Sequence, residues 1–297
     1  AYYDALVVNS GDISATSYAQ GSAQAIRAVS QYGYAEVSNT GDLSATSTYS
    51  NSIGIVAVGY YGAEVYNSGD ITANNTYANT FGMYLYTKNG DAIVNNYGDI
   101  TATNYVGGAS GIYNLSNDND AIVVNSGVIT ATTTYGTAYG INNSTVYGDS
   151  IITNTGDISV TAYYDSTGLF ATSYAGDSNI SNEANVSVIS YSGIAYGVYA
   201  SAHQASAFIG NGGDVDAYSY ASDASALVAV ALDSAFVYSD GSLSAYSVNG
   251  DAIGIVAVAE NNYVNVTNQG NIDAEAYYGS AYGIYTRNYN GNIGITN

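Results

Sequence analysis

The sequence of 297 residues contains no proline, no cysteine and no tryptophan. Average usage of about 5% proline predicts roughly 15 prolines in such a chain, so their absence indicates that nearly every backbone N–H is needed as a donor. Without cysteine, a disulfide scaffold, a cysteine-ligated metal and a thiol nucleophile are excluded. No apolar run approaches about 18 residues, which predicts that the chain does not insert into a membrane as a helix.

Positive charge is also scarce. The only bases are Arg27, Lys88 and Arg287, against 24 acidic residues, and the formal net charge is −21. Binding to nucleic acid needs clustered Lys and Arg to neutralise phosphates, so the sequence predicts no nucleic-acid partner. The sequence opens at Ala1 without a basic, apolar leader, as expected of a mature or excerpted chain.

A repeat fills the whole sequence. The tetrapeptide Asn-x-Gly-Asp recurs with variation at spacings of 28 to 30 residues. The members of its first column are Asn9, Asn39, Asn67, Asn96, Asn125, Asn154, Asn182, Asn211, Ser239, Asn268 and Asn297. Ten periods leave no room for a linker, so residues 1–297 are predicted to form a single repeat domain.

Each period divides into three short β-like segments. Segment A follows the tetrapeptide, as in Gly11–Ala15, and alternates apolar with polar residues at the period of a half-buried strand. Segment B carries a Gly-aliphatic pair, as in Gly54-Ile55. Segment C precedes the Asn and has Val or Ile at one fixed position in all eleven copies. This register predicts that Val65 (segment C) and Ile71 (segment A) point inward.

These segments predict an all-β, parallel β-solenoid of ten coils with three strands per coil. Each segment pairs with its copy about 4.8 Å above, so the stack is about 50 Å long. At the turn, Asn and Gly both tolerate left-handed φ, which predicts a sharp Asn-x-Gly bend. Stacked Asn side chains are expected to pass amide hydrogen bonds from coil to coil.

Recurrent Asn-Ser-Gly-Asp-Ile-Ser-Ala and Ala-x-Gly-Ile segments resemble the passenger repeats of bacterial autotransporter-type surface proteins. Examples are Asn9–Ala15, Asn67–Ala73, Asn125–Ala131, Ala138–Ile141 and Ala252–Ile255. The resemblance implies export to the cell surface, a right-handed β-helix, and an adhesive or structural role.

Acidic residues are the candidates for cation binding. The richest oxygen clusters lie at 117–120 and 211–216, which makes Asp118, Asp120, Asp214 and Asp216 candidate calcium ligands. No other cofactor is predicted. The Asp column of the tetrapeptide is expected mainly to shape the turn by accepting local backbone hydrogen bonds.

Catalysis finds little support in the sequence. Glu36 and Glu64 are the best carboxylate pair for cleaving a polysaccharide, but no basic column flanks them. A Ser-His-Asp triad would need His203, the single histidine, and no nucleophile-elbow motif accompanies it. A solenoid enzyme usually builds its cleft from a long inserted loop, whereas every period here has 28 to 30 residues.

The predicted function is therefore structural. We expect a non-enzymatic, extracellular subunit of a surface filament, with a second copy of itself as partner through head-to-tail stacking of the end coils. The alternatives are an adhesive passenger or stalk that contacts a host surface, and a β-helix that binds or cleaves polysaccharide. The 34 tyrosines offer large amphipathic side chains for lateral contacts.

Overall fold

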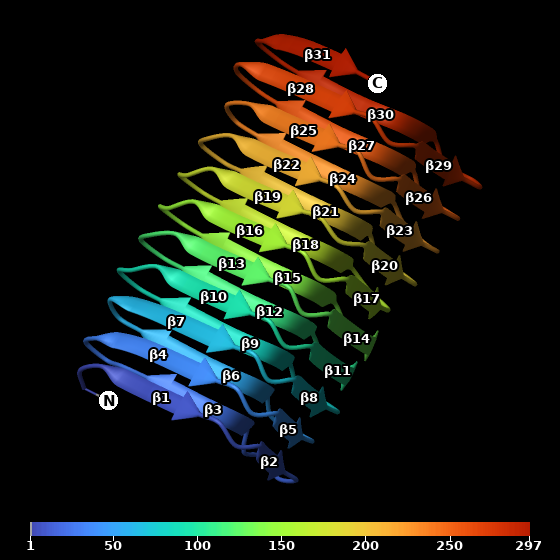
Figure 1. Ribbon diagram of the computed structural model, residues 1–297. Coiled ribbons are helices and arrows are strands. Elements are labelled where there is room, and N and C mark those ends of the chain that lie inside the picture. Colours follow the sequence, from blue (N-terminus) through green and yellow to red (C-terminus); the bar gives the residue numbers. More distant parts are fainter. Residues whose placement is uncertain (1) are drawn as a thin grey trace.

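The structure is a computed structural model that describes residues 2–297. These residues form 31 β-strands and no helix, stacked as a parallel β-solenoid of ten coils with the two chain ends at opposite ends of the stack (Figure 1). The strands make three sheets, which we name after segments A, B and C. The predicted fold class and the three segments per coil are confirmed.

Sheet A contains β2 (Ile13–Ser17), β5 (Leu43–Ser47), β8 (Ile71–Asn75), β11 (Ile100–Val106), β14 (Ile129–Tyr135), β17 (Ile158–Ala162), β20 (Val186–Ser190), β23 (Val215–Ser219), β26 (Leu243–Ser247) and β29 (Ile272–Ala276). Sheet B contains β3 (Ala23–Val29), β6 (Ser52–Gly59), β9 (Thr80–Thr87), β12 (Ala109–Ser116), β15 (Ala138–Thr145), β18 (Ser166–Ser173), β21 (Ala195–Ala202), β24 (Ala224–Ala231), β27 (Ala252–Ala259) and β30 (Ala281–Asn288). Sheet C contains β1 (Ala5–Asn9), β4 (Tyr34–Asn39), β7 (Gly62–Asn67), β10 (Ala92–Asn96), β13 (Ala121–Asn125), β16 (Ser150–Asn154), β19 (Ser178–Asn182), β22 (Ala207–Asn211), β25 (Ala235–Ser239), β28 (Tyr263–Asn268) and β31 (Asn292–Thr296).

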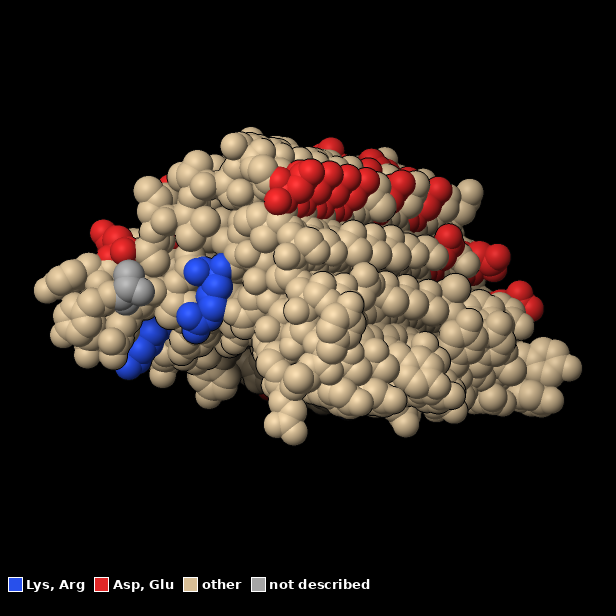
Figure 2. Space-filling view, turned by 90° about the horizontal axis from the view of Figure 1, so that it is seen from below, with Lys and Arg blue, Asp and Glu red and all other residues tan. Residues whose placement is uncertain are grey.

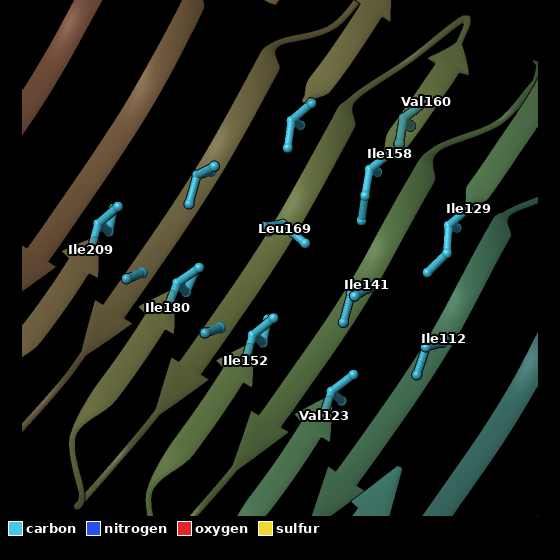
Figure 3. Packing of buried hydrophobic residues seen from close by; sticks show 14 of the residues in the cluster. Ile112, Val123, Ile129, Ile141, Ile152, Ile158, Val160, Leu169, Ile180 and Ile209 are labelled. Atoms are coloured by element: carbon cyan, nitrogen blue, oxygen red, sulfur yellow. The ribbon is translucent and has the colours of Figure 1, made fainter. Parts of the chain in front are cut away.

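The core consists of ladders of equivalent aliphatic residues (Figure 3). Val123 lies beside Ile152 in sheet C, and Ile112 lies beside Ile141 in sheet B. Val65 and Ile71 are buried, as predicted. Because each buried Val or Ile contributes about 1.5–3 kcal/mol relative to an exposed one, each ladder stabilises the stack coil by coil.

The Asn column forms a continuous ladder of amides through the first eight coils. Asn67 Nδ2 donates to Asn96 Oδ1 at 2.9 Å, and Asn96 Nδ2 donates to Asn125 Oδ1 at 2.8 Å. The second N–H of each amide reaches the carbonyl two residues on, as from Asn96 to Gly98 O at 2.7 Å. The predicted passing of hydrogen bonds between coils is confirmed, and it occurs between buried side chains.

The prediction of left-handed φ at the Asn-x-Gly turn is wrong. Within residues 2–297 the only positive φ is that of Gly107, at 120°. The glycine is required by close stacking instead, since a Cβ built on Gly98 would lie 2.1 Å from the Gly69 carbonyl oxygen of the preceding coil. Glycine is therefore required at this turn because neighbouring coils approach each other closely, and not because the backbone has a left-handed φ.

A second glycine column, on sheet B, fits side chains of sheet A in the next coil. A Cβ built on Gly140 would lie 2.4 Å from Cγ2 of Ile158 and 2.6 Å from the carbonyl oxygen of Gly168, and the same two conflicts recur from Gly54 to Gly254. Two coils carry alanine in this column, Ala25 and Ala226, and there the facing position of the next coil is Leu43 or Leu243. Leucine carries a single Cγ on its Cβ, whereas Ile and Val are branched at Cβ. Alanine is therefore tolerated in this column where the facing residue lacks the Cγ that would collide with it.

This pairing predicts a coupled pair of substitutions. Gly140→Ala alone is expected to lower the unfolding free energy by about 1–3 kcal/mol through overpacking against Ile158. Adding Ile158→Leu should recover the part of that loss that comes from Cγ2 of Ile158, while the contact with Gly168 O remains. We expect a coupling energy of about 0.5–3 kcal/mol in a double-mutant cycle measured by denaturant unfolding. Gly283→Ala is the matched control, because only Ile272 Cγ2 lies near it, at 3.9 Å. Additive losses in the cycle would contradict the steric explanation.

Candidate functional surfaces

Carboxylates gather at the corners of the solenoid in rows that follow the stack (Figure 2). At the corner between sheets C and A, Asp42 Oδ1 accepts the backbone N–H of Asp70 at 3.0 Å, and Asp70 Oδ1 accepts that of Asp99 at 2.9 Å. The bonds connect equivalent residues 28 or 29 positions apart. The expectation of local hydrogen bonds is wrong for these residues, because the bonds join neighbouring coils.

Two further corner columns were missed in the sequence. Between sheets B and C, Asp149 Oδ1 accepts the N–H of Asp177 at 2.8 Å, continuing a series that starts at Asp91. Between sheets A and B, Asp251 Oδ1 accepts the N–H of Ser280 at 2.8 Å. The signal was available, because Asp91, Asp120, Asp149 and Asp177 recur at the repeat spacing. Much of the negative charge therefore caps backbone N–H groups of the next coil.

The four candidate calcium ligands lie at separate places. Asp118 is exposed between β12 and β13, where Asn117 donates to its Oδ1, and Asp120 accepts the N–H of Asp149 at 2.8 Å. Asp214 accepts the N–H of Ser242 at 2.9 Å, and Asp216 points outward from β23. Among the described residues, no three His, Cys, Asp or Glu side chains come together as metal ligands. Calcium binding stays a prediction for all four residues, of which Asp120 and Asp214 already accept a backbone N–H through one carboxylate oxygen.

The predicted carboxylate pair exists as a neighbouring pair. Glu36 and Glu64 face each other in register across β4 and β7, and both are exposed. They line a shallow hollow of about 340 Å³ together with Tyr34, Tyr61 and Asp91. Their spacing follows from strand pairing alone, as it would for any repeated residue in this fold. His203 is remote from them, at a turn where its ring stacks on Tyr174 at 5.8 Å.

Tyrosines line the corner that follows sheet A. Tyr49 and Tyr77 stack at 5.5 Å between ring centroids, and Tyr191 and Tyr220 stack at 5.3 Å. Tyr105 and Tyr135 meet edge to face at 5.4 Å. All of these rings are about half exposed. These rings therefore join neighbouring coils by aromatic contacts at several points along the corner.

Four tyrosines have raised pKa values. Burial, a hydrogen bond with Tyr220 and the nearby Tyr220 and Tyr246 hydroxyls raise the pKa of Tyr218 to about 12 from 10.0. Burial is also the main cause that raises the pKa of Tyr84, Tyr139 and Tyr196. These groups ionise more readily in the unfolded chain than in the folded one.

Alkaline pH should therefore destabilise the fold. Well below pH 10 these tyrosines are neutral in both states, and as the pH rises through 10 towards about 12 the unfolded chain loses protons that the folded chain retains. We expect the midpoint of urea unfolding to fall across this window, and to fall less in Tyr218→Phe than in the unmodified protein. A midpoint that is flat across the window would contradict the pKa shifts.

No protein-family model, curated protein or solved structure matches the chain. The β-solenoid is shown by the structure, and the resemblance to autotransporter passengers rests on the repeat motifs alone. Within residues 2–297, no helix is present that is long and apolar enough to cross a membrane.

Proposed function

We propose that the protein is a non-enzymatic structural subunit of an extracellular surface filament, in which β-solenoids stack end to end. The observation that carries the proposal is the constant register of the described stack, in which equivalent strands of neighbouring coils pair in parallel in all three sheets. β1, β2 and β3 each have one hydrogen-bonded neighbour, and so do β29, β30 and β31. Unpaired strand edges are templates for further strands, and here they continue ladders that are in register throughout.

The side chains at the open edge also favour stacking. Ile293 and Ile295 continue the inward columns of sheet C, yet they are 46% and 51% exposed because no described strand lies on their far side. A further coil would bury both. The resemblance of the repeats to surface-protein passengers supports the extracellular location.

The number of strands predicts the geometry of the joint. Sheet C has eleven strands while sheets A and B have ten each. For a gapless joint between two copies of the described stack, β1 of the second copy takes the place that follows β31, which lies over β29 of sheet A. Each subunit is then rotated by one side of the cross-section, roughly 120° for equal sides, with a rise of about 50 Å at about 4.8 Å per coil.

A charge at the open edge tests the proposal. Ile295→Lys places an inward-pointing ammonium where the next coil would stack, a device that blocks strand edges. We expect negative-stain microscopy to show filaments for the unmodified chain and isolated rods for Ile295→Lys, with the same β-sheet circular dichroism spectrum. Thr296→Lys, on the same strand but pointing outward, should still form filaments. A monodisperse monomer at high concentration, or filaments that tolerate Ile295→Lys, would refute end-to-end stacking.

A further inference from the structure

The outward surface of sheet B differs from every other surface of this acidic chain. Three columns of side chains point outward from it. They are Gln24, Ile53, Phe81, Ser110, Tyr139, Thr167, Tyr196, Ser225, Ile253 and Tyr282; then Arg27, Val56, Tyr84, Tyr113, Asn142, Phe170, Tyr199, Val228, Val256 and Tyr285; then Val29, Val58, Tyr86, Leu115, Ser144, Thr172, Ser201, Val230, Val258 and Arg287. Most are aliphatic or aromatic, and none is Asp or Glu. We call this surface the B face.

The side chains of the B face pack against each other into a continuous surface. Tyr84 stacks on Tyr113 with ring centroids 5.4 Å apart and planes 3° apart, and Phe170 stacks on Tyr199 at 5.2 Å. Phe81 meets Tyr84 edge to face at 5.6 Å. Apart from the end coils, the large side chains are half-buried or buried by these neighbours. Such a pre-ordered apolar surface loses little side-chain entropy when it is covered.

The distribution of carboxylates over the three sheets favours a second copy of the chain as the partner that covers the B face. Sheet C carries Glu36 and Glu64 on its outward surface, sheet A carries Asp216, Asp273 and Glu275, and carboxylates line the corners. Two copies meeting through sheet A or C would bury like charges, whereas the three columns of the B face contain no carboxylate. Asp165 and Asp223 lie near Tyr139 and Tyr196, at the edge of the face. Aliphatic Ile and Val side chains at both ends of the face also suit a protein surface better than the hydroxyl groups of a polysaccharide.

The size of the B face is sufficient for a stable dimer. Ten strands at about 4.8 Å, and about 20 Å along each strand, give on the order of 1,000 Å². A standard interface buries about 800 Å² on each partner.

The order of side chains along the B face indicates the orientation. A two-fold axis parallel to the strands places each coil opposite its counterpart counted from the other end, with every column facing itself. In five facing pairs a large residue then meets a smaller one: Phe81 faces Ser225, Tyr196 faces Ser110, Tyr139 faces Thr167, Phe170 faces Asn142 and Leu115 faces Ser201 of the second copy. Tyr113 faces Tyr199, the one place in the third to eighth coils where two rings meet. In the second and ninth coils, Ile53, Val56 and Val58 face the identical set Ile253, Val256 and Val258, and Arg27 faces Tyr285.

The other two-fold arrangement is unfavourable. An axis along the stack places each coil opposite the same coil, so that the central column faces itself in the same order. Arg27 then meets Arg27, and bulky rings such as Tyr84 and Phe170 meet their own copies. We propose that two copies pair through the B face in the antiparallel orientation, an association that does not depend on end-to-end stacking.

Cross-linking between single-cysteine variants tests the orientation, since the chain has no cysteine of its own. Leu115→Cys mixed with Ser201→Cys should form a covalent dimer with a short bifunctional maleimide. Ser201→Cys mixed with Tyr196→Cys should form no covalent dimer, because these two positions face each other only when the two-fold axis runs along the stack. A reversed result would overturn the antiparallel orientation.

Sedimentation analysis tests the association itself, in the Ile295→Lys background that blocks end stacking. Dimer formation should strengthen with added salt, which screens the repulsion between two acidic chains. Tyr84→Glu should weaken it on the order of tenfold or more. Tyr77→Glu, at an exposed corner, is the matched control and should have little effect. A protein that stays monomeric at every salt concentration would overturn the proposal. Binding of a polysaccharide by the unmodified protein that is lost in Tyr84→Glu would also overturn it, because the B face would then bind a carbohydrate.

Discussion

Val123→Asp should abolish cooperative folding or lower the unfolding free energy by about 4 kcal/mol or more. Val123 is fully buried between Val94 and Ile152 in sheet C. An aspartate there loses the burial of the aliphatic side chain and places a carboxylate where no described basic residue pairs with it. Guanidinium unfolding followed by circular dichroism measures the loss.

The adjacent residue on the same strand provides the control. Val124 points outward between Asn95 and Thr153, so Val124→Asp should change the unfolding free energy by about 0.5 kcal/mol or less. Because burial raises the pKa of a carboxyl group, mild acid should partly restore Val123→Asp by neutralising it. Similar losses in the two variants would show that the inward and outward assignment of β13 is wrong.

Asn125→Ala should cost on the order of 3 kcal/mol. Its amide accepts from Asn96 Nδ2 and donates to Asn154 Oδ1 and Gly127 O, each at 2.8 Å. Alanine leaves one donor and two acceptors buried without these partners, and each unsatisfied buried group costs about 1–3 kcal/mol. Thermal and urea unfolding of the variant measure the effect.

A milder substitution separates the hydrogen bonds from simple loss of volume. The ladder already contains a serine at position 239, whose Oγ accepts from Asn211 Nδ2 at 3.3 Å. Asn125→Ser should therefore retain part of the ladder and cost less than Asn125→Ala. Ser126→Ala, at the exposed neighbouring position, should be almost neutral. An unfolding free energy for Asn125→Ser no higher than that for Asn125→Ala would show that the hydrogen bonds of the ladder do not stabilise the fold.

The candidate sites were less predictable than the fold. The sequence pointed to Asp214 as a calcium ligand and to Glu36 and Glu64 as a carboxylate pair. Only stacking shows that Asp214 caps the N–H of Ser242, 28 residues away. The pairing of Glu36 with Glu64 was predictable because equivalent positions of a repeat must face each other in register.

The sequence by itself determined the period, the three segments of each coil and the direction of their side chains. The repeat of 28 to 30 residues and the alternation around Ile71 and Val65 are local patterns, and burial of one face of a strand has a single consistent register. Tertiary structure decided what joins one coil to the next: the close approach at Gly98, the fit of Gly140 against Ile158, and the absence of carboxylates from the whole B face. Those features depend on which residues of neighbouring coils contact each other, and the spacing between coils in the folded stack determines these contacts.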